Sequence, residues 1–265
     1  MKDILIVIPA YNEEKTIGNI VKKLRKKCKI LVINDGSFDR TAKIAKKNGA
    51  KVIDLYKNFG VDYSINEGFK FAKKNKYKYV ITIDADGQHS LNDLNKIIAL
   101  IKKNKNIDLI ISQRSNFPRL SEKLFSLYTI SRFGVKDLLS GLKAYKIEIY
   151  SQYGYYDTFK SIGTELSSYA IENNFNFKTI KINVLDRKDN SRIGGKIVGN
   201  FKILKALIGF QILLLLLLHK HRLIGPLQDF HQSLLIQLDE VGRYVDENHI
   251  TCAHHLGIIV HSDRI

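Results

Sequence analysis

Short apolar runs alternate with segments of helical period along the first 113 residues, and this alternation constrains the fold more than any other feature. The runs typical of buried strands are Ile4–Ile8, Ile30–Ile33, Val52–Leu55, Val80–Ile83 and Leu109–Ser112. Between the first two runs, Ile17, Ile20, Val21 and Leu24 form one helical stripe. Strands separated by helices build a mainly parallel sheet flanked by helices, so we predict an α/β fold with an open, doubly wound sheet.

The chain becomes less regular after residue 113. The elements we expect there are a helix over Ser121–Arg132, a turn at Ser140-Gly141, a helix near Glu165–Asn173 and a strand over Lys178–Val184. We interpret residues 114–200 as the second half of a single domain whose first half is residues 1–113.

Two segments follow this domain of residues 1–200. Residues 201–218 form an apolar, helical pattern whose uninterrupted apolar stretch is shorter than the roughly 20 residues that a membrane span needs. Residues 219–265 hold seven of the eight histidines and four basic against six acidic residues, and we assign them no role. His254-His255 near Cys252 lacks the spacing of a metal site, so we interpret it as solvated surface.

Charge and cysteine content limit the partners and the compartment. Lys and Arg number 43 against 26 Asp and Glu, so the surface should attract phosphate-rich partners such as nucleotides, nucleic acid or anionic lipid. Cys28 and Cys252 are far apart, which excludes a disulfide framework and fits a reducing cytoplasm. The first residues lack the regions of a secretory signal, and we interpret them as a strand.

An acidic pair follows the fourth predicted strand. Asp84 and Asp86 stand at i and i+2, and Gly87 permits the sharp turn that leaves the strand. Such a pair suits a hard divalent cation, which keeps waters and shares its other positions with phosphates. A solvated acidic turn is the alternative, but the position at a strand's carboxyl end favours a Mg²⁺ or Mn²⁺ site.

Polar clusters also follow the first two predicted strands. Pro9-Ala10-Tyr11-Asn12-Glu13-Glu14 ends the first strand, and Asn34-Asp35-Gly36-Ser37 with Asp39 and Thr41 ends the second. In a parallel sheet these loops are neighbours, and together they offer a ring, carboxylates and hydroxyls to a base and a ribose. Helix capping by Asn12, Ser37 and Asp39 remains an alternative role.

These motifs in this order resemble the family 2 glycosyltransferases of GT-A fold, especially the dolichol-phosphate mannosyltransferase and polyprenyl-phosphate glycosyltransferase branch. The matching residues are Ile8 to Glu14, Asp35-Gly36-Ser37 with Thr41, Asn58, Gly60 and Gly68, and Asp84 to His89. Weaker matches are Ser140 to Tyr145, Glu165-Leu166, Arg187 and Ser191-Arg192, so that about four fifths of the chain is covered. Asn34, Lys143 and Arg192 depart from the usual Asp, Arg and Lys.

The resemblance implies roles residue by residue. It implies nucleotide binding by Pro9, Tyr11, Glu13 and Asp35, and metal and diphosphate binding by Asp84, Asp86 and Gln88. It also puts Lys143, Arg187 and Arg192 near donor or acceptor phosphates. Arg114 joins both the catalytic pair Asp84 and Asp86 and the phosphate-binding group, because it follows the last predicted strand and would face the same crevice.

The function that we expect is an inverting, metal-dependent transfer of a sugar from a nucleotide-diphosphate sugar to a polyprenyl phosphate. We expect a cytoplasmic protein at an anionic membrane surface, with residues 203–218 lying in the interface, or alternatively buried against the sheet. A second interpretation is transfer to a glycan or protein hydroxyl, which requires a general base. A third is a non-catalytic binder of membrane or nucleic acid, but neither an RNP-type aromatic cluster nor a phosphate loop is present.

Overall fold

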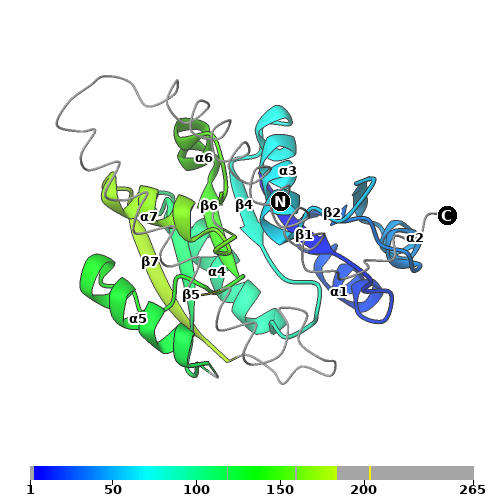
Figure 1. The fold of residues 1–265 in the computed structure, drawn as a ribbon. Coiled ribbons are helices and arrows are strands. Elements are labelled where there is room, and N and C mark those ends of the chain that lie inside the picture. Colours follow the sequence, from blue (N-terminus) through cyan, green and yellow to red (C-terminus); the bar gives the residue numbers. More distant parts are fainter. Residues whose placement is uncertain (1–2, 118, 159, 184–202, 204–265) are drawn as a thin grey trace, which may run out of the picture. The chain divides into compact units, whose positions relative to one another are not determined.

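A computed structural model of the 265-residue chain describes residues 3–117, 119–158, 160–183 and 203 (Figure 1). Arg187, Arg192 and the segments 201–218 and 219–265, with the exception of Ile203, lie outside the described residues. The expectations for these positions therefore stay predictions.

The described residues build a sheet of seven strands in the order β3-β2-β1-β4-β6-β5-β7. The strands are β1 (Ile4–Ala10), β2 (Lys29–Asn34), β3 (Lys51–Asp54), β4 (Tyr79–Thr82), β5 (Leu109–Arg114), β6 (Lys143–Lys146) and β7 (Phe177–Ile182). All neighbouring pairs are parallel except those that β6 makes with β4 and β5. The predicted mainly parallel α/β sheet is confirmed.

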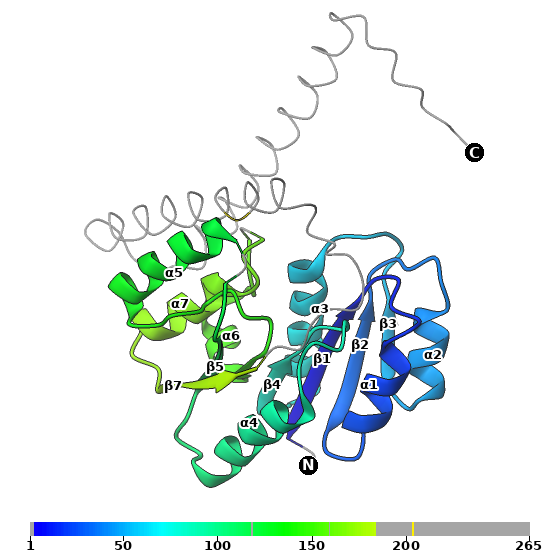
Figure 2. The same cartoon turned by 90° about the horizontal axis from the view of Figure 1, so that it is seen from below.

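Helices cover both faces of this sheet (Figures 1 and 2). They are α1 (Ile17–Leu24), α2 (Thr41–Lys47), α3 (Val61–Lys74), α4 (Leu91–Lys103), α5 (Leu120–Phe133), α6 (Ile147–Tyr153) and α7 (Thr164–Glu172). Ser90 caps α4, since its Oγ accepts a hydrogen bond from the Asp93 N–H. The predicted stripe of α1 is confirmed, because Ile17, Val21 and Leu24 are buried.

The core has two layers, one on each face of the sheet. Alternate residues of β1 point to opposite faces, so that Ile6 packs with α1, α2 and α4 whereas Val7 packs with α3 and α5 to α7. All seven residues of β1 are buried, as expected for a central parallel strand that is covered on both sides. This double burial holds the carboxyl ends of β1, β2 and β4 in a fixed position.

Strand β6 has no counterpart among the strands predicted from the sequence, and some strand ends differ from the predicted ones. β6 is only four residues long and carries a lysine at each end, so it lacks the apolar run by which the other central strands were found. β4 ends at Thr82, one residue earlier than predicted, and β7 is Phe177–Ile182 where Lys178–Val184 was predicted. Because β6 enters antiparallel between β4 and β5, the mainly parallel sheet contains one antiparallel strand that the sequence did not indicate.

Candidate functional site at the carboxyl edge of the sheet

The loops that follow β1 and β2 are joined by hydrogen bonds between side chains and backbone. The Asn12 N–H donates to Ser37 Oγ at 2.9 Å, and the Phe38 N–H donates to Asn12 Oδ1 at 2.9 Å. The Glu13 N–H donates to Thr41 Oγ1 at 2.7 Å. Asn12 and Ser37 thus join two loops, whereas we had considered capping of their own helices. The two predicted donor loops are therefore held side by side.

The predicted nucleotide residues on β1 and its loop differ in exposure. Pro9 lies in the buried strand and Glu13 is 7% exposed, with Thr16 Oγ1 donating to Glu13 Oε2 at 2.8 Å. Tyr11 is half-buried, and its ring meets the exposed ring of Phe38 edge to face, with centroids 6.4 Å apart. Of these, the two rings offer the surface on which a planar base can stack.

Asp35 is buried and holds the loop that precedes α3. Its two carboxylate oxygens accept hydrogen bonds from the N–H groups of Phe59 and Gly60, at 2.8 and 2.9 Å. Burial raises the pKa of Asp35, while these two bonds oppose the rise. A Cβ on Gly36 would lie 2.4 Å from the Lys57 carbonyl carbon, so the neighbouring loop leaves room only for glycine. The structure thus gives Asp35 a loop-shaping contact that the sequence did not indicate.

The acidic pair lies in a turn beyond β4. Because β4 ends at Thr82, Asp84 and Asp86 do not continue the strand, and their i, i+2 spacing does not by itself put them on one side. A turn begins at Ala85, Asp86 Oδ1 accepts from the Gln88 N–H at 3.0 Å, and Gly87 has a φ of 77°. The turn geometry therefore sets the direction of the Asp86 carboxylate.

Gly141, in the loop before β6, lies directly against Asp84. A Cβ on Gly141 would approach Asp84 Oδ2 to 2.2 Å, so the carboxylate occupies space that any other residue would fill. The Gly141 carbonyl accepts a hydrogen bond from Thr82 Oγ1 at 2.8 Å, which fixes the loop to β4. The Ser140-Gly141 turn of the second half is thus part of the acidic site.

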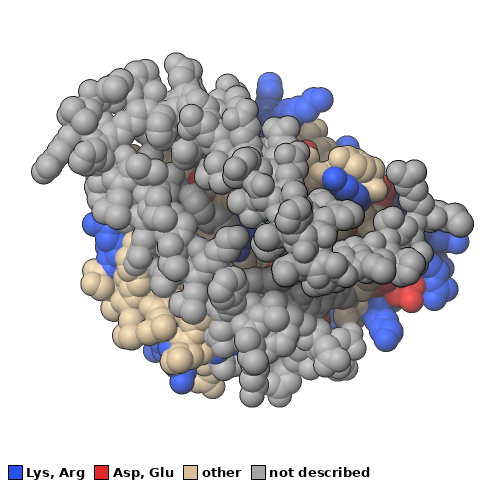
Figure 3. Space-filling model, viewed as in Figure 1, with Lys and Arg blue, Asp and Glu red and all other residues tan. Residues whose placement is uncertain are grey.

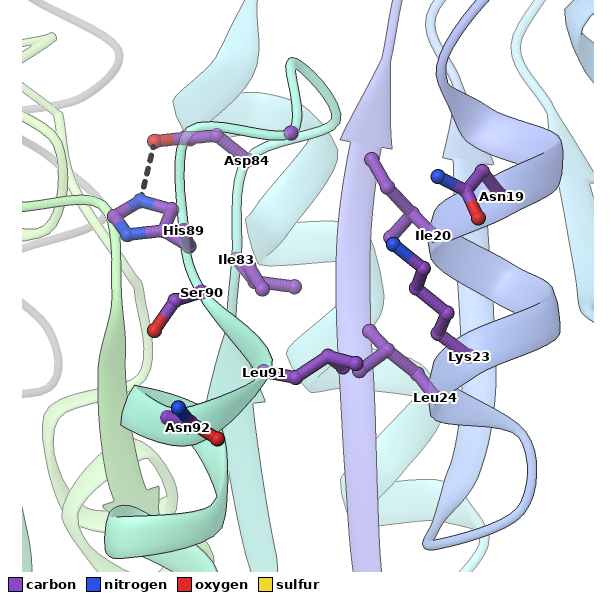
Figure 4. Close-up of a pocket in the computed structure, with 11 residues that line it drawn as sticks. Asn19, Ile20, Lys23, Leu24, Ile83, Asp84, His89, Ser90, Leu91 and Asn92 are labelled. Carbon is purple, nitrogen blue, oxygen red and sulfur yellow. Dashed lines mark hydrogen bonds and ion pairs between the residues drawn. The ribbon is translucent and has the colours of Figure 1, made fainter. Parts of the chain in front are cut away.

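His89 holds Asp84, and the sequence analysis gave it no role. Its Nε2 lies 3.3 Å from Asp84 Oδ2, and its side chain is 5% exposed (Figure 4). Its Nδ1 is buried without a hydrogen-bond partner among the described residues. The available signal was the position of His89 five residues after Asp84, directly beyond a glycine turn.

A cavity of about 270 Å³ lies beside this site, between α1 and the segment from Ile83 to Asn92. Asn19 and Lys23 of α1 line one side, and Asp84, His89 and Ser90 line the other (Figure 4). Neither Tyr11 nor Asp35 lines it. The cavity therefore adjoins the acidic pair without being the nucleotide pocket that we predicted.

The residues of the acidic turn fit a divalent cation of the Mg²⁺ or Mn²⁺ class. Within the described residues no three His, Cys, Asp or Glu side chains group as a metal site. A cation of this class takes one or two protein carboxylates and completes its shell with waters and substrate phosphates. Two carboxylates that follow a strand end, one of them in the space left by Gly141, meet that requirement.

Arg114 ends β5 and is neutralised by two carboxylates. Its Nε donates to Asp137 Oδ2 at 2.8 Å, and an Nη lies 3.3 Å from Glu122 Oε1. Burial opposes its charge, but the contacts with Asp137 and Glu122 outweigh this and raise the pKa of Arg114. It remains 20% exposed and lines a hollow of about 150 Å³ with Ser115, Asn116 and Asn183.

Lys143 is fully buried, although we had expected it near phosphates. Its Nζ donates to the carbonyl of Ile162 at 2.7 Å. Burial lowers the pKa of Lys143 to about 8, against the opposing charges of Asp157, Asp137 and Asp62. Lys143 therefore belongs to an interior charge cluster in this structure and does not reach the surface.

The chain is similar in sequence to proteins of a known family. A sequence profile described as glycosyl transferase family 2 matches residues 5–208. An uncharacterised protein of Methanocaldococcus jannaschii is 32% identical over 225 residues, which cover 78% of this chain and 91% of that protein. A UDP-N-acetylglucosamine–dolichyl-phosphate N-acetylglucosaminyltransferase of Methanococcus voltae is 31% identical over 175 residues, which cover 54% of this chain and 69% of that one.

A solved structure shows the same fold. Glucosyl-3-phosphoglycerate synthase of Mycobacterium tuberculosis, in complex with Mn²⁺, UDP-glucose and glycerol 3-phosphate, has a TM-score of 0.64 at 17% identity. The match covers 78% of this chain and 79% of that chain, and at this identity it bears on the fold alone. The GT-A fold that the resemblance implied is thereby confirmed. None of the helices in the described part of the chain is long and apolar enough to cross a membrane.

Proposed function

Because the chain belongs to glycosyl transferase family 2, we propose that it transfers a sugar from a nucleoside-diphosphate sugar to a polyprenyl phosphate, with inversion at the anomeric carbon. The observation that carries the proposal is the acidic turn beyond β4. There Asp84 occupies the space left by Gly141 and contacts His89, so its carboxylate has a defined direction. This turn follows β4, which pairs with β1. The loop after β1 is in turn hydrogen-bonded to the loop after β2.

The donor nucleoside binds, in this proposal, between the loops after β1 and β2. Tyr11 and the exposed Phe38 supply stacking surface, while Pro9 and Glu13 shape the loop from within. Asp35 contributes indirectly, because its carboxylate holds the backbone of Phe59 and Gly60 in the neighbouring loop. A loop pair that is rigid before the donor arrives loses less conformational entropy when it binds.

Asp84, Asp86 and Gln88 hold the divalent cation and the diphosphate in this proposal. Bound there, Mg²⁺ or Mn²⁺ supplies neutralisation of the negative charge that appears on the departing nucleoside diphosphate. His89 orients the Asp84 carboxylate through its Nε2, and Gly141 leaves room for that carboxylate. Gly87 permits the turn that brings the Gln88 N–H to Asp86.

The acceptor phosphate attacks the anomeric carbon from the face opposite the diphosphate. A bond forms between a phosphate oxygen and that carbon while the bond to the diphosphate oxygen breaks, and the electron pair leaves with the nucleoside diphosphate. A phosphate monoester has a second pKa of about 6, so the attacking oxygen is already anionic and needs no general base. Positioning and charge stabilisation then provide the catalysis.

We propose that Arg114, Arg187 and Arg192 bind this phosphate, and that the fully buried Lys143 does not contact it directly. The hollow beside Arg114 is lined by Ser115, Asn116 and Asn183, residues that can hydrogen-bond to a phosphate. The relative from Methanococcus voltae carries a dolichyl-phosphate acceptor in its name, which supports the same acceptor class. Lys143 contributes from the interior, through the charge cluster that it shares with Asp137.

The proposal includes a place for the protein in the cell. With 43 basic against 26 acidic residues, the chain is attracted to anionic surfaces, and a polyprenyl phosphate keeps its charged end at a membrane surface. We therefore propose a cytoplasmic protein that associates peripherally with the membrane and has no nucleic-acid partner.

The test is transfer from a panel of labelled nucleotide sugars with Mn²⁺ present. We expect transfer to a polyprenyl phosphate in detergent or vesicles, and loss of transfer when EDTA is added. Transfer to a soluble glycan hydroxyl with the lipid phosphate ignored would overturn the acceptor assignment. Turnover that EDTA leaves unchanged would overturn the metal assignment.

A further inference from the structure

Helix α5 turns apolar side chains toward solvent. Leu120, Leu124, Leu127 and Ile130 are 68%, 44%, 65% and 46% exposed, and they are four of the seven large apolar side chains exposed among the described residues. Their spacing of four, three and three residues aligns them along one side of the helix. We call these four residues the α5 apolar face.

The opposite side of α5 is the more polar one, although it packs on the core. Its buried residues are Ser121, Glu122, Phe125, Ser126, Thr129 and Phe133. An ordinary surface helix buries its apolar stripe and exposes its polar side, and α5 reverses this arrangement. Exposed apolar patches of this kind are typical of surfaces that bind a partner or a membrane.

Basic side chains accompany the α5 apolar face. Lys123 is exposed between Leu120 and Leu124, and Lys136 is exposed just beyond the helix. The only acidic residue within α5 is Glu122, which is buried against Arg114. Figure 3 shows the tan surface over α5, at the lower left, with Lys and Arg atoms at its borders. The partner therefore combines apolar material with negative charge.

We propose that the α5 apolar face inserts into the surface of an anionic lipid bilayer, with Lys123 among the lipid headgroups. Apolar side chains that enter the interface gain by burial, and each nearby lysine adds attraction to anionic lipid. This role is separate from that expected for residues 203–218. It deepens the proposed function, on which it rests, because it names the surface from which the acceptor is taken.

The structure joins the α5 apolar face to the hollow lined by Arg114, where the proposed function puts the acceptor phosphate. Arg114 lines the hollow and its guanidinium lies 3.3 Å from Glu122 in the first turn of α5. Arg119 bonds to the same carboxylate, since its N–H donates to Glu122 Oε2 at 3.2 Å. The ion pair of Arg114 with Glu122 on the buried side of α5 thus fixes the position of the hollow relative to the α5 apolar face. A lipid phosphate at Arg114 keeps its chain in the bilayer that α5 contacts.

A second copy of this chain fits the face less well. A twofold contact through α5 brings the same surface together from both copies, so Lys123 of one meets the basic surroundings of the other. Like charges placed opposite each other in an interface oppose association. Anionic lipid meets the same residues with the opposite charge.

A single tryptophan tests the insertion, because the chain contains none. Leu124→Trp in the full chain puts the only indole on the α5 apolar face, and Tyr56→Trp puts it on a site that is 84% exposed in the loop after β3. Vesicles of phosphatidylcholine and phosphatidylglycerol, about 3:1, serve as the probe. We expect a blue shift of the Leu124→Trp emission and its quenching by brominated lipid, and neither effect for Tyr56→Trp.

Loss of apolar surface tests the same point by affinity. Leu124→Gln with Leu127→Gln should weaken vesicle binding by about tenfold or more, with an unchanged thermal midpoint because both positions are exposed. The control is Val61→Gln, which also replaces an exposed apolar side chain by glutamine but lies on α3, and it should leave vesicle binding unchanged. The double variant should lose transfer to vesicle-embedded polyprenyl phosphate and keep the wild-type affinity for nucleoside diphosphate.

Each outcome separates this inference from the proposed function. An unshifted Leu124→Trp emission, or wild-type vesicle binding by the double variant, overturns the inference even where transfer to polyprenyl phosphate is observed. A blue shift without vesicles that grows with protein concentration identifies a second copy as the partner and also overturns it. Vesicle binding that depends on Leu124 and Leu127, in a protein without transfer activity, supports the inference and contradicts the proposed function.

Discussion

The two halves of the described domain use their polar motif residues in opposite ways. In the first half, Asn12 and Ser37 bond across neighbouring loops and hold the carboxyl edge of the sheet. In the second half, Arg114 turns onto Asp137, and Lys143 donates to a buried carbonyl. A cation in a family motif can therefore bind groups in the protein interior. Polar residues at the ends of parallel strands lie together at one edge because the sheet brings those ends together.

The largest effect should come from the acidic turn of the first half. Asp86→Asn should lower transfer by about a thousandfold or more, because the diphosphate loses charge stabilisation that acts mainly in the transition state. Steady-state rates with saturating Mn²⁺ measure this. Asp54→Asn removes an exposed carboxylate that pairs with Lys46, and it should keep wild-type rates. Equal losses in both variants would contradict the assignment of Asp86.

The interior role of Arg114 predicts the next largest effect, on stability. Asp137→Ala leaves the mostly buried Arg114 guanidinium with Glu122 as its one remaining ion-pair partner among the described residues, and should cost about 3 kcal/mol of unfolding free energy. Glu172→Ala removes the partner of the more exposed Arg132 and should cost less than about 1 kcal/mol. Urea unfolding of both variants provides the measurement. Equal costs would mean that Arg114 is no more structural than a surface arginine.

Burial of Lys143 makes the stability of the second half depend on pH. Its pKa is lowered by burial to about 8 from an ordinary value near 10.5, so the unfolded chain binds more protons between these two values. Stability from this group is therefore complete above about pH 10.5 and is lost as the pH falls through 8, by up to about 3 kcal/mol.

Lys143→Met tests this window. The unfolding free energy of the wild type minus that of the variant should rise from pH 8 to pH 10.5 and stay constant below pH 7. Denaturant unfolding at a series of pH values measures it. A difference that does not change with pH would show that Lys143 titrates like an exposed lysine.

The smallest effect should come from the bonds between the donor loops. Ser37→Ala removes the acceptor of the Asn12 N–H and should cost about 1 kcal/mol of stability, together with a weaker affinity for nucleoside diphosphate. Calorimetry with UDP and GDP measures the affinity. Ser151→Ala on α6 provides the control and should change neither quantity. Unchanged nucleotide affinity in the Ser37 variant would separate the loop bonds from the donor site.

Much of the first half could be predicted from local patterns. The apolar runs at β1, β2 and β4 and the stripe of α1 follow from the burial periods of strands and helices, and the structure confirms these elements. The family resemblance rested on motifs at strand ends and is confirmed by the profile match. The roles of Asp84, Asp86 and Asp35 in binding stay predictions.

The sequence by itself determined the mainly parallel sheet, the neighbouring positions of the loops after β1 and β2, and the acidic turn, because each depends on residues close in the chain or on the ends of adjacent strands. Only the tertiary structure decided what the later residues do. The contact of Gly141 with Asp84 depends on the pairing of β6 with β4. The pairing of Arg114 with Asp137 and the burial of the more polar side of α5 likewise depend on contacts between segments distant in the chain. Strand β6 is short and carries a lysine at each end, so its sequence does not look like a buried strand. Its pairing with β4 on one side and β5 on the other makes it a central strand.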